Sequence, residues 1–354
     1  MLTVVTGATG HLGNNLVRAL LERDQRVRAF VYPGDDTRSI AGLAVERVHG
    51  DVRDLDALMR AFEGADLVFH LAGLISIVPG QGELLRQVNV GGTLNVVEAC
   101  LRCGVRRLVH TASIHALVEP PHGETIDERA PFDPSRIATE YGRSKAEAAL
   151  GVLAGVERGL DAVIVCPSGV VGPYDFLPSR MGQLFLDVVR SRMPVYVRGA
   201  YNFVDARDVV QGQIAAAERG RRGEHYILSG ERVSVGQLMV YLEEISGVRA
   251  PRLGIPAKLA RGVSSLAALY ARITRTRPIL TTESVDILES NCCISHAKAG
   301  RELGYAPRPI RETVADTIQW FRAAGMLPTR PALPQWASMI LYPWTWGRQV
   351  VETS

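Results

Sequence analysis

The segment TGATGHLG, residues 6–13, follows directly on the apolar run Leu2–Thr6 and opens a helical pattern. An apolar run that ends in glycines is typical of a buried parallel strand. Three glycines at intervals of three are more than a plain turn requires. In this setting Gly7 permits the tight turn, Gly10 lets the backbone approach a pyrophosphate, and Gly13 lets the helix pack closely on the strand.

A helix N-terminus binds phosphate well because its first N–H groups lack intrahelical partners. The loop therefore predicts a dinucleotide site formed by Gly7, Thr9, Gly10, His11, Leu12 and Gly13. Three further places that follow strand patterns are expected to line the same ligand: Tyr32, Asp51 with Val52, and Leu71-Ala72-Gly73. Asp51 suits a hydrogen bond from the adenine amino group, a helix N-cap, or both.

Strand and helix patterns alternate through residues 1–166, the expected dinucleotide-binding domain. This alternation predicts an α/β fold with a doubly wound parallel sheet and helices on both faces, the Rossmann arrangement. The expected strands are Leu2–Thr6, Val27–Tyr32, Val45–His49, Leu67–Leu71, Arg107–Thr111 and Ala162–Cys166. The expected helices are Leu12–Leu21, Leu55–Phe62, Leu84–Cys103 and Thr139–Glu157.

Prolines and glycines break up the chain after Pro167. We interpret residues 167–322 as a smaller, mixed substrate-binding lobe over the carboxyl ends of the strands, where such sheets bind ligands. Within this lobe, Phe203–Val204 and Tyr226–Leu228 are expected to return to the main sheet as strands. Residues 323–354 form an aromatic-rich C-terminal tail.

Tyr141 and Lys145 stand four residues apart in a helical pattern, so their side chains share one face. Of the 40 basic residues only three are lysines, so lysine is not the default cation of this chain. An adjacent ammonium lowers the pKa of a phenol toward working pH. We therefore predict that Tyr141 exchanges the carbonyl or alcohol proton. Ser113, at the end of the fifth strand pattern, is the candidate for steadying the developing oxyanion.

The motifs that support a family resemblance are TGATGHLG, Leu71-Ala72-Gly73, Asn89, Ser113, Tyr141 and Lys145. Combined, they resemble the extended short-chain dehydrogenase/reductase family, within the NAD-dependent epimerase/dehydratase superfamily, from residue 2 to about residue 321. The resemblance implies Tyr141 as acid/base, Lys145 on the nicotinamide ribose and Ser113 on the substrate oxygen. It places Asn89 in support of the neighbouring helix. It further implies cofactor contacts at Thr111, Tyr141, Lys145, Pro167, Ser168 and Val170.

The cofactor is predicted to be NAD or NADP, with a slight preference for NAD. An acidic residue about 20 positions past the loop would bind the ribose hydroxyls of NAD, whereas an arginine would favour the extra phosphate of NADP. The second strand ends at Tyr32 with neither residue, and Asp35, Asp36 and Arg38 follow.

Two substrate classes divide the family: nucleotide sugars, and reducible compounds such as dihydroflavonols and steroids. Sugar-nucleotide members resemble one another in an Arg-Asp-Tyr-Ile-His-like segment whose arginine holds a diphosphate. Aligned on Asp208, this chain has Tyr201 in place of that arginine. The sequence is most similar to the dihydroflavonol reductase and 3β-hydroxysteroid dehydrogenase branch. We therefore expect hydride transfer at a carbonyl or secondary alcohol of an apolar ring or lipid-like substrate, of steroid, dihydroflavonol or aldehyde type.

The main alternative is a nucleotide-sugar epimerase or dehydratase in which Arg198 or Arg207 replaces the missing arginine. A remote alternative, a non-catalytic dinucleotide-binding regulatory protein, conflicts with the presence of both Tyr141 and Lys145. An expected set of apolar residues either lines a pocket for a ring or packs the lobe. This set is Leu74, Ile75, Ile77, Val78, Ala116, Leu117, Phe176, Leu177, Met181 and Phe185.

The composition is that of an ordinary globular protein, with 47% hydrophobic and 22% charged residues. A net charge of +3 without any Lys/Arg block gives no reason to expect nucleic acid as a partner. Neither a leader pattern nor a stretch of ~20 apolar residues is present, so we expect a cytoplasmic protein. Cys100 and Cys103 form a lone C-x-x-C in a helical pattern, and no metal is predicted.

The tail after Phe321 holds three of the four tryptophans, Trp336, Trp344 and Trp346. It is too apolar for a free terminus and too short to cross a bilayer. Docking on protein, either the chain's own lobe or a homodimer partner, is the favoured interpretation. Peripheral membrane contact is the alternative.

Overall fold

The structure is a computed structural model that describes residues 1–75, 80–262 and 290–328. The expectations for Ile77, Val78 and the three tail tryptophans lie outside these ranges. Among the described helices, none has the length and apolarity that crossing a membrane would take.

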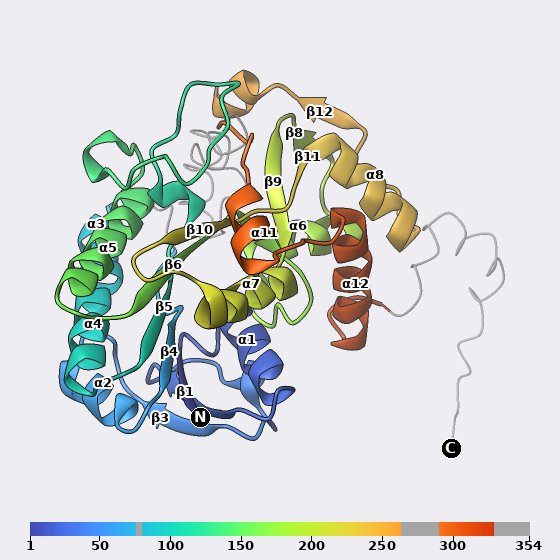
Figure 1. Cartoon of the computed structure of the whole chain (residues 1–354). Coiled ribbons are helices and arrows are strands. Elements are labelled where there is room, and N and C mark those ends of the chain that lie inside the picture. Colours follow the sequence, from blue (N-terminus) through green and yellow to red (C-terminus); the bar gives the residue numbers. More distant parts are fainter. Residues whose placement is uncertain (76–79, 263–289, 329–354) are drawn as a thin grey trace, which may run out of the picture.

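A seven-stranded sheet forms the centre of the described chain, in the order β10-β6-β5-β4-β1-β2-β3, and every neighbouring pair is parallel (Figure 1). The strands are β1 (Leu2–Thr6), β2 (Arg26–Val31), β3 (Glu46–His49), β4 (Leu67–His70), β5 (Arg107–Thr111), β6 (Ala162–Pro167) and β10 (His225–Leu228). The predicted doubly wound sheet is confirmed. The strand order reverses between β1 and β4, and in such sheets ligands bind at the carboxyl ends of the strands beside this reversal.

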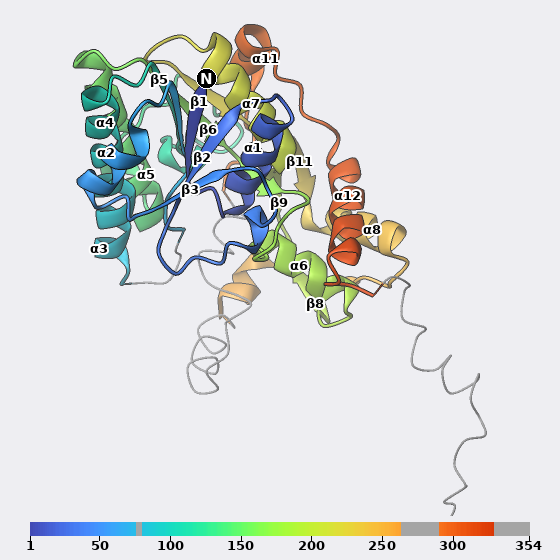
Figure 2. The same ribbon diagram turned by 90° about the horizontal axis from the view of Figure 1, so that it is seen from below.

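Helices cover both faces of the sheet (Figures 1 and 2). One face carries α1 (His11–Leu21), α7 (Ala206–Arg219) and α11 (Ala297–Leu303); the other carries α2 (Leu55–Phe62), α4 (Gly92–Arg102) and α5 (Glu140–Glu157). Their apolar stripes fill two separate cores, one including Leu16, Leu20 and Val209 and the other including Phe62 and Val96. These cores hold the strand ends in place for the site.

The helix expected over Leu84–Cys103 is interrupted. A short α3 (Gly82–Leu85) runs into a π-helical turn over Arg86–Gly91, and α4 begins only at Gly92. Helical periodicity does not distinguish a π turn from an α turn, so the sequence did not show the interruption. Such turns are frequent at functional sites, and this one carries Asn89.

A smaller mixed lobe follows β6, as predicted. It contains a sheet of β7 (Gly169–Val171), β9 (Ala200–Asp205) and β11 (Glu231–Ser234), and a pair of β8 (Val195–Val197) with β12 (Leu253–Ile255). Helices α6 (Arg180–Val189), α8 (Val235–Ser246) and α12 (Ile310–Ala323) pack with them around a third core. We call this lobe the cap; it occupies the side of the molecule where α6, α8 and α12 cluster in Figure 2.

The two strands expected to return to the main sheet behave differently. Tyr226–Leu228 does return, as β10 beside β6. Phe203–Val204 does not, which corrects the prediction: it lies in β9, parallel to β7 and antiparallel to β11. A short apolar run fits either sheet, so its composition alone does not decide between them.

Candidate active site

The glycine loop closes against the end of β4. Gly7 has φ +70°, and a Cβ there would lie 2.7 Å from the Ala72 nitrogen. A Cβ on Gly13 would lie 2.0 Å from the Gly7 carbonyl oxygen. Gly10 is the N-cap of α1 and supplies no side-chain hydrogen bond to it. The loop therefore leaves the first N–H groups of α1 without a side-chain cap beside a glycine cradle, which fits the pyrophosphate of a dinucleotide.

The tip of β2 brings acidic groups to this loop. The Thr9 hydroxyl donates to Asp35 at 2.8 Å, whereas Arg38 is tied to Asp36 at 2.5 Å. Hydrogen bonds from Arg38 hold the pKa of Asp36 below its usual value. Tyr32 is half exposed at the strand end. Asp35 is thus the acidic group nearest the cradle, while the arginine is already engaged.

Asp51 does not cap a helix. Its carboxylate binds Arg53 at 2.5 Å, and that hydrogen bond lowers its pKa. The N-cap of α2 is Asp54, which accepts from the Ala57 N–H at 3.1 Å. The N-cap interpretation of Asp51 was wrong because two aspartates precede this helix and the one closer to it takes the position. Val52 is buried beside Gly92, where a Cβ would come 2.6 Å from it.

Helix α5 presents Tyr141 and Lys145. Thr139 caps the helix by accepting from the Gly142 N–H at 3.1 Å, which sets Tyr141 in the first turn. Lys145 is 6% exposed, and its Nζ donates to the Thr111 carbonyl at 2.6 Å. Burial lowers the pKa of Lys145 to about 8. Helix α5 thus carries a buried ammonium at the end of β5.

Ser113 follows β5 and lies beside Tyr141. Its Oγ accepts from the His115 N–H at 3.2 Å. Burial raises the pKa of Tyr141, and a hydrogen bond with Ser113 partly opposes this rise. The prediction that Lys145 lowers the Tyr141 pKa is wrong for this structure, because Lys145 binds the Thr111 carbonyl and desolvation dominates at the phenol. Tyr141 is therefore a protonated acid at neutral pH, as carbonyl reduction requires.

Asn89 connects this helix to the segment after β4. Its Oδ1 accepts from the Leu74 N–H at 2.7 Å, and its Nδ2 donates to the Leu74 carbonyl and to Ser144 Oγ, both at 3.0 Å. Ser144 in turn donates to the Tyr141 carbonyl at 2.8 Å. Asn89 therefore fixes backbone on one side of the site and the catalytic helix on the other.

The structure adds two residues that the sequence reasoning did not assign to the site, His115 and Tyr201. A 2.8 Å hydrogen bond joins the Tyr201 hydroxyl to His115 Nε2. Burial lowers the pKa of His115 to about 4 and raises that of Tyr201, so both groups are neutral. The tyrosine ring lies against Gly169, where a Cβ would come 2.6 Å from it. The available signals were the position of His115, two residues after Ser113, and of Tyr201 at the expected arginine.

The β6 end and Thr111 make polar contacts with cap and helix. Ser168 Oγ donates to Asn202 Oδ1 at 2.7 Å, which ties the segment containing Pro167 and Val170 to β9. The Thr111 hydroxyl accepts from Gln213 at 2.9 Å. Neither Asn202 nor Gln213 follows a sequence motif that would have marked it.

The expected apolar wall divides into two groups. Ile75 and Leu177 lie on the surface and are 71% and 59% exposed. Ala116 and Leu117 are buried in the sheet core, and Phe185 is buried in the cap core, so these three do not line a pocket. Their apolar character is explained by packing alone.

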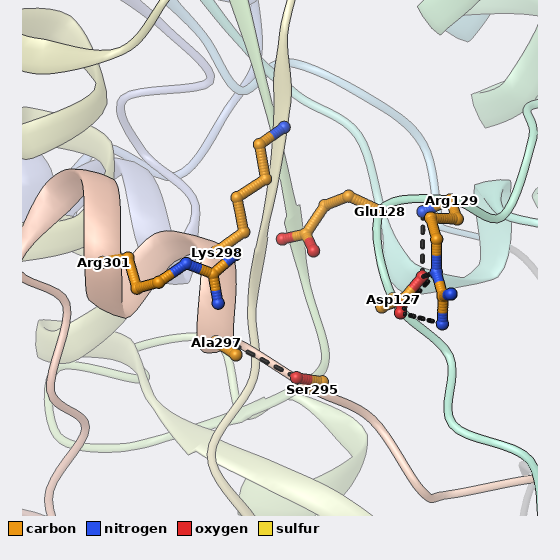
Figure 3. Close-up of a pocket in the computed structure, with 7 residues that line it drawn as sticks. All are labelled: Asp127, Glu128, Arg129, Ser295, Ala297, Lys298 and Arg301. Atoms are coloured by element: carbon orange, nitrogen blue, oxygen red, sulfur yellow. Dashed lines mark hydrogen bonds and ion pairs between the residues drawn. The ribbon is translucent and has the colours of Figure 1, made fainter.

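A separate cavity of about 350 Å³ lies between α11 and the loop before α5 (Figure 3). Its lining residues are Asp127, Glu128, Arg129, Ser295, Ala297, Lys298 and Arg301. Arg129 is paired with Asp127 at 2.7 Å, and Lys298 with Glu224 at 2.6 Å. None of the predicted site residues lines this cavity. Within the described ranges, no cluster of three metal-ligating side chains occurs.

The chain is similar to known proteins over most of its length. The family described as the NAD dependent epimerase/dehydratase family matches residues 3–236. Sterol demethylase protein B of Methylococcus capsulatus is 42% identical over 331 residues, covering 92% of this chain and 100% of that protein. A 3 beta-hydroxysteroid dehydrogenase/Delta 5-->4-isomerase of Mycobacterium tuberculosis is 31% identical over 325 residues, covering 86% and 85%.

Among solved structures, that of gox2253 has a TM-score of 0.81 and 37% identity, covering 92% of this chain and 99% of that one. The match to a family of NAD-dependent enzymes and the names of these relatives support an oxidoreductase role. The predicted resemblance is confirmed, and the chain belongs to the NAD-dependent epimerase/dehydratase family.

Proposed function

We propose that this protein interconverts a secondary alcohol and a ketone on a sterol-type ring, with NAD as the preferred cofactor. The observation that carries the proposal is the neutral Tyr201–His115 pair at 2.8 Å, which stands beside Ser113 where sugar-nucleotide enzymes would have an arginine. A neutral pair lacks the charge that a diphosphate requires but suits an uncharged ring substrate.

In the reducing direction, Tyr141 donates its phenolic proton to the substrate oxygen. The raised pKa keeps this proton in place until charge develops on that oxygen. Ser113, already bound to the His115 N–H and to Tyr141, holds the oxygen beside the phenol. When bound, the nicotinamide supplies or accepts the hydride. Lys145 would hold its ribose from the floor of the site.

The sterol class is favoured by the 42% identical sterol demethylase protein over its full length. Exposed Ile75 and Leu177 offer apolar surface of the kind that a fused-ring substrate buries. A putative dihydroflavonol 4-reductase of Synechocystis is 32% identical over 330 residues, which is below the 42% of the sterol demethylase protein.

The epimerase alternative requires Arg198 or Arg207 to replace the missing diphosphate-binding arginine, and Arg207 is already engaged. Arg207 is held by Asp205 at 2.7 Å and by Asp316 at 2.6 Å, so its charge is already satisfied within the protein. Arg198 lies at an exposed position after β8. A diphosphate would therefore rely on a solvated arginine alone.

Two features stay predictions at this level. Asp35 beside Thr9 supports the preference for NAD over NADP, because a carboxylate accepts from ribose hydroxyls and repels a phosphate. The other is a homodimer; Leu94 on α4 and Leu150 on α5 are 47% and 42% exposed. Docking of the tail on protein, its contact with a membrane and the cytoplasmic location also stay predictions.

The test is a spectrophotometric assay of reduced nicotinamide with dehydroepiandrosterone, dihydroquercetin and UDP-glucose, each with both cofactors. We expect oxidation of the 3β-hydroxysteroid with NAD that accelerates at alkaline pH, because Tyr141 with its raised pKa must lose its proton to act as the base, and no oxidation in Tyr141→Phe. Calorimetric titration with UDP-glucose is expected to show no binding. Micromolar binding of UDP-glucose together with inertness toward the steroid would replace this proposal by the epimerase alternative.

A further inference from the structure

Two histidines lie side by side in the sheet next to the catalytic lysine. His70 in β4 pairs in register with His110 in β5, and their ring centroids are 5.2 Å apart. Both side chains are essentially fully buried. Burial and the Lys145 ammonium lower the pKa of each, that of His70 to about 3, so both rings are neutral. In burial and charge the two are closely matched.

Their hydrogen bonding is opposite. His70 Nδ1 lies 2.7 Å from Thr6 Oγ1, and its Nε2 lies 3.0 Å from Thr93 Oγ1. Within the described chain, neither ring nitrogen of His110 has a partner. His70 therefore joins Thr6 to Thr93 through hydrogen bonds, whereas His110 contributes only packing in the same layer.

These hydrogen bonds form a series, and the number of protons available on each group fixes the direction of every bond in it. Thr93 uses its single hydroxyl proton on the Asn89 carbonyl at 2.6 Å, so it must accept from His70 Nε2–H. His70 Nδ1 is then bare and accepts the Thr6 hydroxyl proton. The Thr6 oxygen remains free to accept the Ala72 N–H at 3.2 Å. Each of these groups has a partner.

This series of hydrogen bonds, together with the Asn89 side chain, fixes both ends of the segment that follows β4. Ala72 is fixed through Thr6, and Leu74 is fixed through the Asn89 side chain. Gly73 lies between them, and a Cβ on it would come 3.8 Å from Lys145 Nζ and 3.2 Å from Asn89 Oδ1. The hydrogen bonds to Ala72 and Leu74 therefore set the distance between the Gly73 backbone and the Lys145 ammonium.

We propose that His70 is a positioning residue, which holds the cofactor-lining segment Leu71–Leu74 in place against Lys145. An apolar ring of the same size would fill the space but leave Thr6 without an acceptor and Thr93 without a donor. The consequence for hydride transfer rests on the proposed function, whereas the backbone effect does not.

The primary variant is His70→Phe, with His110→Phe as the matched control one strand away. Amide hydrogen exchange resolved over residues 71–75 reads the backbone directly. We expect exchange about tenfold faster in His70→Phe, because the Ala72 and Leu74 N–H acceptors are loosened. The dissociation constant for NAD should rise at least about threefold and steroid turnover fall about tenfold or more, with KM changed less. His110→Phe should leave all three unchanged.

Two further variants keep the test decisive if His70→Phe does not fold. Thr93→Val breaks the same series of hydrogen bonds from the other side and should reproduce the exchange and NAD effects. His70→Gln restores a donor toward Thr93 and should recover part of the loss. If the exchange and NAD affinity of His70→Phe, or of Thr93→Val in its place, match those of His110→Phe, the positioning role is overturned. If these effects appear while the wild-type protein leaves steroids untouched, the positioning role stands and the proposed substrate is wrong.

Discussion

Gly13 of the glycine loop and Gly236 of the cap have different surroundings. In the loop, glycines meet backbone: a Cβ on Gly13 would lie 2.0 Å from the Gly7 oxygen. On helix α8 of the cap, a Cβ on Gly236 would meet only the side chain of Tyr196, whose hydroxyl would lie 3.0 Å away. Backbone cannot move aside, whereas a side-chain end can. Position 13 of the loop is therefore restricted to glycine, whereas position 236 of the cap should tolerate a larger side chain.

The largest effect should separate chemistry from cofactor binding. Tyr141→Phe removes the proton donor but keeps the ring, so turnover should fall by about two to four powers of ten. Affinity for NAD should change little, because the glycine loop is untouched. Steady-state assay and NADH titration measure the two quantities. Turnover near that of the wild type would show that Tyr141 is not the acid.

The next test sets a glycine of the loop against one of the cap. Gly13→Ala should destabilise the protein by about 3 kcal/mol or more and abolish NAD binding, because the methyl group meets fixed backbone. Gly236→Ala should be neutral or slightly stabilising, because the Tyr196 side chain can shift and alanine favours the helix. Thermal denaturation and NADH titration distinguish them. Equal losses in both variants would contradict the contrast between the regions.

Acid should destabilise the protein through the histidines buried in its central sheet. Buried His70 has a folded pKa of about 3 and buried His110 one well below its usual value. The unfolded chain therefore binds more protons below about pH 6.5, and each histidine removes about 1.4 kcal/mol of stability per pH unit as pH falls. Stability is complete above that pH. Urea titrations at several pH values should show this slope, and His110→Phe should reduce it by one proton.

A smaller effect is expected in the cap. Tyr201→Phe leaves His115 Nε2 without its 2.8 Å partner and loosens the turn that carries Ser113. We expect kcat/KM for the steroid to fall about tenfold with NAD affinity unchanged. Tyr196→Phe is the matched control and should behave like the wild type. If the two variants are indistinguishable, Tyr201 plays no part in the site.

The sequence predicted the regions whose structure is local. Gly10 and Gly13 act through the backbone of Gly7 and Ala8, a few residues away, and the helix carrying Tyr141 and Lys145 shows its period directly. The Tyr201–His115 pair joins residues 86 positions apart, and no periodicity reports such a contact. The sequence did not predict which sheet β9 joins, nor did it predict the π turn at Asn89. Neither feature leaves a distinct pattern in a short stretch of sequence.

The burial of Lys145 should lower the free energy of unfolding, although the proposed reaction requires this residue. Its pKa of about 8 in the folded state, against a usual value near 10.5, means that burial disfavours the charged form. Below pH 8 Lys145 is charged in the folded protein, so the full cost of burying that charge lowers the free energy of unfolding. This free energy should rise with pH between about 8 and 10.5. Lys145→Met should therefore be inactive yet more stable at neutral pH by order of 1–3 kcal/mol, detectable as a higher Tm. The buried ammonium therefore lowers the free energy of unfolding at neutral pH.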